Sequence, residues 1–242
     1  MKMLLTIYFI LFIILVLYFI LEIIRNPTYG LIPYNKFVEY ISDKKVFYSQ
    51  EEKNKIFPTS LILEKHWRAI RKEALNVMGE NIQNVGRNFI IEDEDFWKGW
   101  RTYPLRMFGK DNKINIENCP IMKQILTDHP DILTAFFSLI EPGKTLPSHY
   151  GPFKGILRYH LGLLVPPKEA GNCLISVDGE IYEWREGEGV LFDETYKHFV
   201  LNGTQYPRIV LFIDVKRPFD NMLMRIINNM IIWTISVSPY NN

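Results

Sequence analysis

The chain begins with a long apolar segment, which restricts its fold more than any other feature of the sequence. Met3–Leu21 spans nineteen residues without a charged side chain, and Glu22 and Arg25 are the first charges that follow. About 20 apolar residues are needed to cross a bilayer core, whereas a cleaved signal peptide has a shorter apolar run and small residues at its cleavage site. We therefore expect a retained, single-pass transmembrane helix within residues 1–25, which contacts the membrane through residues 3–24, rather than a signal peptide or a buried helix.

The charges on the two sides of this segment differ only slightly. Lys2 and the terminal amine precede it. The residues that follow it include Arg25, Lys36 and Lys44. Under the positive-inside rule this small excess favours a cytosolic position for the C-terminal domain. Over the whole chain, 28 Lys and Arg residues against 27 Asp and Glu residues leave a formal charge of +1. This balance disfavours a partner held by bulk positive charge, so no nucleic-acid partner is expected.

Composition divides the rest of the chain into three parts. Residues 26–59 mix Pro, Gly and charged residues and are expected to form a connector. Residues 60–218 hold the patterns of one globular domain, with helices supporting its N-terminal part. Residues 219–242 contain an apolar run that polar side chains interrupt. An amphipathic helix with a short tail is therefore a better prediction there than a second membrane span.

Two helices are expected in the N-terminal part of this domain. Apolar residues recur from Leu63 to Val77 at spacings of three and four, which predicts one helix with a single apolar stripe, capped by Ser60. A second helix is expected from Pro120 to about Ser138. The stripe of the first helix consists of Leu63, Trp67, Ile70, Ala74 and Val77.

Beyond residue 143 the chain consists of short β-prone runs separated by turns. Asp178-Gly179 lies between two such runs, from Cys173 to Trp184, which is typical of a β-hairpin. Arg208 to Val215 is nearly continuous in apolar residues, which indicates a buried strand. Several short strands at this spacing predict a mainly β domain, as a jelly roll or barrel, joined to the helical N-terminal part in an α+β chain.

One of these runs carries polar residues in an unusual place. In the expected strand Gly155–Val165, alternation puts Arg158 and His160 on one face and apolar side chains on the other. Buried polar groups need partners, so the pair is compatible either with a satisfied polar pair in the core or with a charged ligand in the lumen. His149 precedes this strand, and His198 and Arg208 follow it. Imidazoles suit ferrous iron, and an Arg suits a carboxylate.

These segments also resemble a known family. The run Ser138–Leu163, together with GEGVLFDETYKHFVLNGT and RIVLFIDVKRP, is similar to the aspartyl/asparaginyl β-hydroxylase family of Fe(II)- and 2-oxoglutarate-dependent dioxygenases, over about residues 60–218. The resemblance implies a double-stranded β-helix, that is, a cupin-like jelly roll. It implies Fe(II), 2-oxoglutarate as cosubstrate and O2. The implied iron ligands are His149 and His198, and the implied contacts of 2-oxoglutarate are Arg208 to its far carboxylate, with Ser138, Arg158 and His160.

The sequence departs from the widespread two-His-one-carboxylate motif at one position. That motif would place Asp or Glu at residue 151, where this chain has Gly151. The iron would then have two protein ligands, as in the peptide hydroxylases of the family. Asp193 is a candidate to compensate by orienting His198, and it is equally compatible with a turn residue at a strand end.

Three functions remain open from the sequence. The first hypothesis is hydroxylation of the β-carbon of Asp or Asn in a protein substrate, which the residues around His149 favour. The second is hydroxylation of a lipid acyl chain, because the anchor, the Pro33–Asn35 segment and the FDET block resemble the bacterial lipid A hydroxylases. The third is a non-catalytic jelly-roll binding module. Cys119 and Cys173 match no zinc spacing, and whether they pair is left open.

Overall fold

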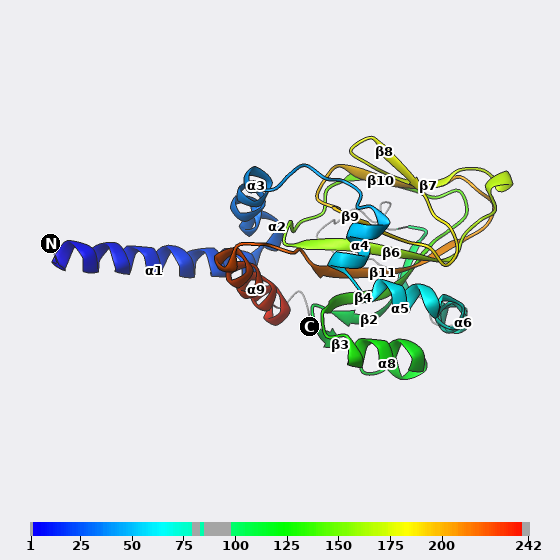
Figure 1. Cartoon of the computed structure of the whole chain (residues 1–242), viewed down its shortest axis with the longest axis horizontal. Helices are drawn as coiled ribbons and strands as arrows, with labels where there is room; N and C mark the ends of the chain where they lie inside the picture. Colours follow the sequence, from blue (N-terminus) through cyan, green and yellow to red (C-terminus); the bar gives the residue numbers. More distant parts are fainter. Residues whose placement is uncertain (1, 79–82, 85–97, 239–242) are drawn as a thin grey trace.

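The chain forms two facing β-sheets behind a long N-terminal helix (Figure 1). This computed structural model describes residues 2–78, 83–84 and 98–238. The larger sheet contains β1 Gln83–Asn84, β2 Trp100–Met107, β3 Lys110–Asp111, β4 Ile132–Ile140, β6 Ile156–Leu164, β9 Gly189–Phe192 and β11 Arg208–Lys216. The smaller sheet contains β5 Thr145–His149, β7 Cys173–Val177, β8 Glu180–Glu183 and β10 His198–Asn202.

The strand order is that of a jelly roll. The larger sheet has the order β1-β2-β4-β11-β6-β9, with β3 beside β2, and the smaller sheet has the order β5-β10-β7-β8. From β4 to β11 the chain therefore crosses repeatedly between the two sheets, and its first and last strands, β4 and β11, lie side by side. Such a double sheet with Greek-key connections defines the jelly roll. The predicted mainly β fold is confirmed.

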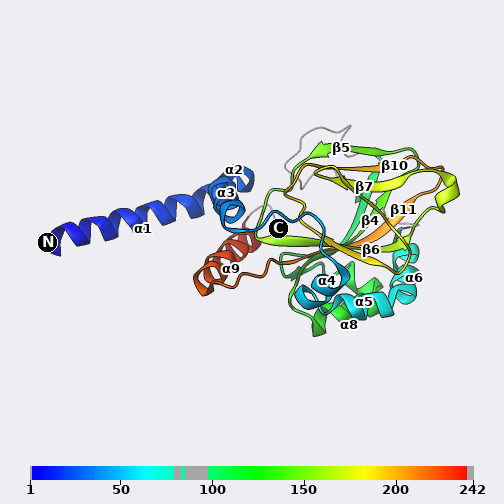
Figure 2. The ribbon, with the colours of Figure 1, turned by 45° about the horizontal axis from the view of Figure 1, so that its top comes forward.

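Helices cover one side of the sandwich and extend from one end of it. The helices are α1 Lys2–Arg25, α2 Pro27–Gly30, α3 Ile32–Ile41, α4 Gln50–Ile56, α5 Ser60–Lys65, α6 Trp67–Met78, α8 Pro120–Asp128 and α9 Met222–Val237, with 3-10 turns at Ile116–Asn118 and Lys168–Ala170. In Figures 1 and 2, α4, α5, α6 and α8 lie over the larger sheet, and α1 projects away from the body beside α2, α3 and α9. Residues 26–59, expected as a connector, contain three of these helices. Across the described ranges, no helix is long and apolar enough to span a membrane.

The two helices predicted before the β region differ from the observed ones. The first is broken at His66 into α5 and α6, and Thr59 rather than Ser60 is the residue before its first turn. The second ends at Asp128, and Ser138 lies in β4 instead. Pro130 explains the early end, because the residue before a proline avoids helical geometry.

The hairpin and the final strand follow the sequence prediction. Val177 pairs with Glu180, so Asp178 and Gly179 alone form the turn between β7 and β8. Both have positive φ, at 49° and 87°, which a two-residue hairpin turn of this kind requires. β11 is buried along all but its last residue.

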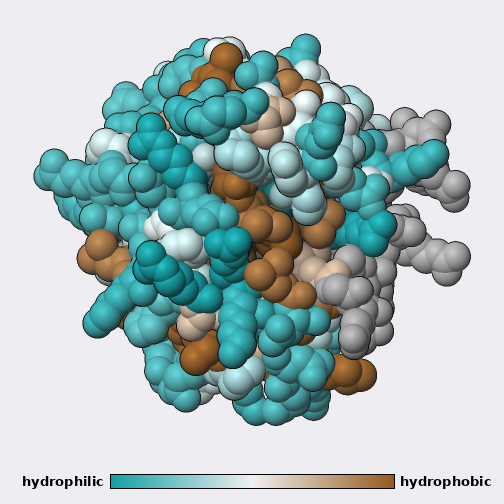
Figure 3. All heavy atoms as spheres, turned by 90° about the vertical axis from the view of Figure 1, so that its right-hand side faces the viewer, coloured by the Kyte–Doolittle hydropathy of each residue, from teal (hydrophilic) through white to brown (hydrophobic). Residues whose placement is uncertain are grey.

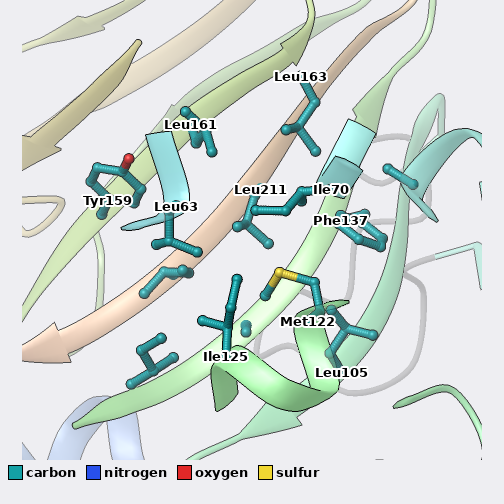
Figure 4. Packing of buried hydrophobic residues seen from close by; sticks show 14 of the residues in the cluster. Leu63, Ile70, Leu105, Met122, Ile125, Phe137, Tyr159, Leu161, Leu163 and Leu211 are labelled. Carbon is teal, nitrogen blue, oxygen red and sulfur yellow. The ribbon is translucent and has the colours of Figure 1, made fainter. Parts of the chain in front are cut away.

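The core has separate parts on the two faces of the larger sheet. One face of β6 presents Leu157, Tyr159, Leu161 and Leu163 to the covering helices, where they pack with residues such as Leu63 (Figure 4). The other face points between the sheets, where a second apolar cluster lies. The predicted alternation along this strand is confirmed. A third cluster joins the end of α1, α9 and the start of β6.

Candidate functional site

A pocket of about 370 Å³, including its open mouth, lies between the two sheets. Residues of eight strands line it, because the inner faces of both sheets point toward it. All the predicted metal and cosubstrate residues reach it. Its lining is Trp100, Ser138, Leu146, His149, Arg158, His160, Ile175, Phe192, His198, Val200, Arg208 and Phe212.

The two predicted iron ligands lie side by side. His149 ends β5, His198 begins β10, and the antiparallel register pairs them directly. Their ring centroids are 4.1 Å apart. His149 Nδ1 lies 2.8 Å from the carbonyl of Pro147, and His198 Nδ1 lies 2.9 Å from the carbonyl of Tyr196. A proton on each Nδ1 satisfies these carbonyls and leaves the lone pair on Nε2, which is the arrangement that metal-binding histidines use.

Burial keeps these imidazoles neutral. Desolvation, helped by the neighbouring His149, lowers the pKa of His198 to about 3. Desolvation and the charge of Arg158 lower the pKa of His149, although its bond to the Pro147 carbonyl opposes the shift. Neutral imidazole is the form that coordinates a metal. Within the described part of the chain, no group of three or more His, Cys, Asp or Glu side chains is placed to hold a metal ion.

Arg208, the first residue of β11, also lines the pocket, and two of its side-chain nitrogens have no hydrogen-bond partner among the described residues. Its side chain is 1% exposed, and its Nε and Nη1 have no hydrogen-bond partner among the described residues. Its guanidinium lies 4.4 Å from the ring centre of Trp184. Burial lowers its pKa to about 10, so it stays charged at neutral pH. A buried cation with unpaired donors is costly unless a ligand pairs with it, which fits an anionic cosubstrate.

His160 and Ser138 extend the polar wall of the pocket. Neither ring nitrogen of His160 has a hydrogen-bond partner in the described ranges. Burial and the charges of Arg208 and Arg158 hold the pKa of His160 well below its usual range, so the ring is neutral. Ser138 accepts a 2.9 Å hydrogen bond from Trp100 Nε1, which leaves its hydroxyl proton able to donate. These atoms fit the role of ligand contacts.

Arg158 reaches the pocket but is held by two carboxylates. Its Nε lies 2.9 Å from Asp214 Oδ1, and its Nη1 forms an ion pair with Glu194. Its guanidinium also lies 3.9 Å from the ring centre of Phe212. The predicted contact of Arg158 with the cosubstrate stays a prediction, because these partners already occupy much of its donor capacity.

Glu194 is the residue at this site that the sequence did not single out. Its side chain is 3% exposed, and its Oε1 has no hydrogen-bond partner in the described part of the chain. It lies against Gly151: a Cβ at residue 151 would come within 2.5 Å of Glu194 Cδ. The carboxylate of Glu194 thus fills the space that a side chain at position 151 would need. The available signal was an acidic residue in the FDET block, four residues before His198.

Of the two roles left open for Asp193, the structure shows the turn residue at a strand end. Asp193 directly follows β9, and its Oδ1 accepts hydrogen bonds from Thr195 N at 3.0 Å and from Thr195 Oγ1 at 2.6 Å. Asp193 also pairs with Arg217, and Lys154 Nζ lies 3.4 Å from its Oδ2. The carbonyl of Tyr196, not Asp193, receives the Nδ1 proton of His198 and orients that ring. The physical reason is that the buried cations attract the Asp193 carboxylate toward the ends of β6 and β11.

The residues present fit ferrous iron and 2-oxoglutarate. Two neutral imidazoles with their Nδ1 atoms on backbone carbonyls are suited to a metal, and the unpaired donors of buried Arg208 are suited to a carboxylate. The orphaned nitrogens of His160 lie in the same pocket. Cys119 and Cys173 are both free and buried, and neither lines the pocket.

Comparisons with known proteins identify relatives of two kinds. The ornithine lipid ester-linked acyl 2-hydroxylase of Rhizobium tropici is 36% identical over 170 residues, which cover 68% of this chain and 59% of that protein. The human aspartyl/asparaginyl β-hydroxylase is 30% identical over 163 residues, which cover 64% of this chain and 21% of that protein. The matched region thus spans less than two thirds of either relative.

Among solved structures, a Pseudomonas putida prolyl-4-hydroxylase aligns with a TM-score of 0.42 and 17% identity, over 64% of this chain and 88% of its own. The model of the aspartyl/asparaginyl β-hydroxylase family matches residues 64–218. Since this match covers well over half of the sequence, the chain belongs to the aspartyl/asparaginyl β-hydroxylase family.

Proposed function

We propose that this hydroxylase-family protein uses Fe(II), 2-oxoglutarate and O2 to hydroxylate the acyl chain of a membrane lipid. The cofactor assignment rests on two neutral imidazoles side by side, the buried His198 and the half-buried His149, in one pocket with the buried Arg208, whose Nε and Nη1 have no hydrogen-bond partner among the described residues. Membership of the family supports hydroxylation as the broader class of reaction. The cofactors and the substrate are the more specific part of the proposal.

Each pocket residue has a role in this proposal. His149 and His198 hold the iron, Arg208 pairs with the far carboxylate of 2-oxoglutarate, and His160 and Ser138 bind its remaining oxygens. When bound, iron, 2-oxoglutarate and O2 would supply the oxidising chemistry that replaces hydrogen by hydroxyl at a C–H bond. The apolar side chains of the lining exclude water from this chemistry.

Two observations support a lipid substrate. The Rhizobium protein, whose name gives a lipid acyl chain as its substrate, matches this chain at higher identity and over a larger share of it than the human protein does. The apolar segment Met3–Leu21 forms part of α1, which projects from the body of the molecule (Figure 1). In our proposal, residues 1–25 anchor the protein in a membrane by a single pass, with the jelly roll on the cytosolic side.

Hydroxylation of Asp or Asn in a protein is the second candidate. Gly151 favours it, because the peptide hydroxylases that the chain resembles lack an acidic ligand at this position. The human aspartyl/asparaginyl β-hydroxylase is a relative at 30% identity. Both candidates use the same iron and cosubstrate residues, so they differ in substrate and not in chemistry.

The deciding experiment supplies the full chain, in detergent, with iron, ascorbate and 2-oxoglutarate. A membrane lipid extract and an Asp- and Asn-containing peptide are offered in parallel, and succinate and the product mass are measured. A lipid that gains one oxygen supports the proposal, and a peptide that gains one oxygen selects the second candidate. Absence of both turnover and 2-oxoglutarate binding would instead indicate a non-catalytic binding module. His198→Ala is the matched inactive control.

Arg208→Lys tests the cosubstrate assignment separately. A lysine retains the charge but loses the two-pronged contact with a carboxylate, which is worth about tenfold or more in affinity. We expect the concentration of 2-oxoglutarate needed for half-maximal succinate formation to rise by at least about tenfold, with an unchanged requirement for iron. An unchanged dependence on 2-oxoglutarate would remove Arg208 from the site.

A further inference from the structure

Helix α9 has a wide apolar face that is largely exposed in the described structure. Six of its apolar side chains are between 46% and 68% exposed. On an ideal helix, where each residue turns by about 100°, they fall within one sector of about 100°. On the same ideal helix, Asn229 lies about 20° beyond this sector and Arg225 about 60° beyond it, and the buried residues lie on the opposite side. The exposed apolar residues are Met222, Leu223, Ile226, Met230, Trp233 and Val237.

Helix α3 adds a second exposed apolar face near the same end of the molecule. Phe37 is 51% exposed and Tyr40 is 88% exposed, with Lys36 exposed beside them. In Figures 1 and 2, α3 and α9 flank the inner end of α1, where α1 leaves the body. α1 packs against α9 and itself exposes apolar side chains, Leu17 among them. Exposed apolar side chains therefore occur on all three helices at this end of the molecule.

The opposite end of the molecule has a different character. Figure 3 shows that end as largely hydrophilic, with apolar residues gathered near its centre. Large exposed apolar patches are rare on a free surface and mark a contact with a protein or a membrane. Trp and Tyr are enriched where a protein crosses from water into a bilayer, and basic side chains meet its headgroups. Trp233, Tyr40, Lys36 and Arg225 supply these residue types.

This surface is connected to the histidine end of the pocket. The segment 150–155 joins His149 to β6, and α3 and α9 both bind it. Asn35 of α3 donates to the carbonyl of Pro152 at 2.7 Å, and Asn228 of α9 donates to the carbonyl of Gly155 at 2.9 Å. Tyr34 joins the two helices by donating to Asn228 Oδ1 at 2.8 Å. The helices with exposed apolar faces therefore hold the segment that follows His149.

We propose that the exposed faces of α3 and α9 lie in the headgroup region of the bilayer that α1 enters, so that the histidine end of the pocket borders the membrane surface. This inference rests on the proposed membrane anchor and deepens the proposed function. It places a lipid acyl chain, or another substrate held at the membrane, next to the segment 150–155. A second copy of the chain or a soluble protein could cover the same surface instead, and the test below distinguishes these cases from a membrane contact.

The test uses spin labels on the full chain in vesicles of phosphatidylethanolamine and phosphatidylglycerol. A label at Met230→Cys reports on the apolar sector of α9. Ile181→Cys, an exposed apolar site on β8, is the matched control. Collisions with dissolved oxygen and with a water-soluble nickel complex are measured, and unlabelled wild-type chain checks the native cysteines. We expect the Met230 label alone to prefer oxygen.

Two other outcomes overturn the proposal. A Met230 label as accessible to nickel as the Ile181 label shows a face in water. A Met230 label that is shielded from both reagents and broadened by a neighbouring label shows contact between copies. Flotation of the same vesicles tests the anchor separately. If the chain floats with the vesicles while the Met230 label is in water, only the proposed membrane contact of α3 and α9 is refuted. If the chain does not float, both the anchor and this contact are refuted.

A kinetic measurement tests the link to the pocket. Trp233→Glu places a charge in the apolar sector, at a residue that does not line the pocket, and Ile181→Glu, at an equally exposed apolar site on β8, is its control. With a lipid substrate in vesicles, we expect the apparent KM of Trp233→Glu to rise about tenfold, because the variant loses the contact of one aromatic ring with the bilayer. With the same substrate in detergent micelles, both variants should match wild type. An equal effect in vesicles and micelles would contradict a membrane contact.

Discussion

Gly151 is a position where space, rather than chemistry, restricts the residue. A Cβ there would lie 2.5 Å from both Cγ and Cδ of Glu194, and Glu194 is itself buried and paired with Arg158. Gly151→Ala therefore forces a buried side chain to move. We expect the free energy of unfolding to fall by about 1–3 kcal/mol, measured by urea denaturation. Gly203→Ala is the control, because its nearest contact would be an ordinary 3.4 Å.

The cause of this loss can be tested with a double-mutant cycle. In a Glu194→Ala background the clash is absent, so Gly151→Ala should cost less than it does in the wild-type chain. An equal cost in both backgrounds would show that the backbone at Gly151, and not Glu194, sets the requirement. Gly151→Asp should fail for the same steric reason as Gly151→Ala, and would not restore a carboxylate ligand without displacing Glu194.

The two cysteines allow a prediction about pH. Burial raises the pKa of Cys119 to about 12, and burial also raises the pKa of Cys173, although Arg208 opposes that shift. The thiolate is the reactive form, so both groups should resist Ellman's reagent in the folded chain at pH 8. Both should react after unfolding in urea. Rapid reaction of either thiol in the folded chain at pH 8 would contradict the burial.

At the residue scale, the sequence predicted which side chains share the pocket better than it predicted their partners. Strand alternation placed Arg158 and His160 together, because a period of two is fixed by strand geometry. The partners of Arg158 lie far away in sequence, Asp214 on β11 and Glu194 between β9 and β10, and these contacts depend on how the strands register. No local pattern encodes that register, which is why Glu194 was missed and why the role of Asp193 could not be decided from the sequence.

At the scale of elements, a buried ion cluster fixes the turn that precedes β10. Asp193 pairs with Arg217 beyond the end of β11 and with Lys154 before β6, and all three side chains are at most 7% exposed. Arg217 also donates to the carbonyl of Lys154 at 2.6 Å. The cluster therefore ties together the ends of three strands, next to His198.

Asp193→Ala should be strongly destabilising. It leaves two buried cations without their carboxylate, and the removal of one partner from a buried ion pair costs about 3–5 kcal/mol. Urea denaturation measures the loss. Glu117→Ala is the matched control, since Glu117 pairs with the exposed Lys123 and should contribute about 1 kcal/mol or less. A similar loss of unfolding free energy in the two variants would show that the buried cluster stabilises the fold no more than a surface ion pair does.

Elements were predictable where local chemistry decides them. Asp178-Gly179 specifies its own turn, so the β7–β8 hairpin followed from two residues. The helix stripe was also correct in the residues it buries, such as Ile70 and Ala74. The break at His66 was not visible, because α5 and α6 continue the same apolar stripe on both sides of it. The segment after Pro130 is apolar throughout, and an unbroken apolar run does not distinguish a buried helix from a buried strand.

At the scale of the whole molecule, the third apolar cluster decides where the folded body begins. Ile23 of α1 is 5% exposed and Leu31 is 1% exposed, and both pack with α9 and the start of β6. Leu17, one turn and a half earlier in α1, is 54% exposed. The sequence suggested a boundary after residue 25, whereas these contacts extend the packed body to the last turn of α1.

This boundary predicts how truncated chains behave. A chain of residues 22–242 keeps Ile23 and Leu31, so it should unfold at the same urea concentration as the full chain in the same detergent. A chain of residues 35–242 loses both, together with the Tyr34 bond to Asn228. Removal of one buried Leu or Ile side chain costs about 2–5 kcal/mol, so the shorter chain should lose at least that much. Because Asn228 also holds Gly155, the shorter chain should bind ferrous iron more weakly as well. Equal stability of the two truncated chains would show that the packed body begins at or after residue 35, and that the third apolar cluster does not support the pocket.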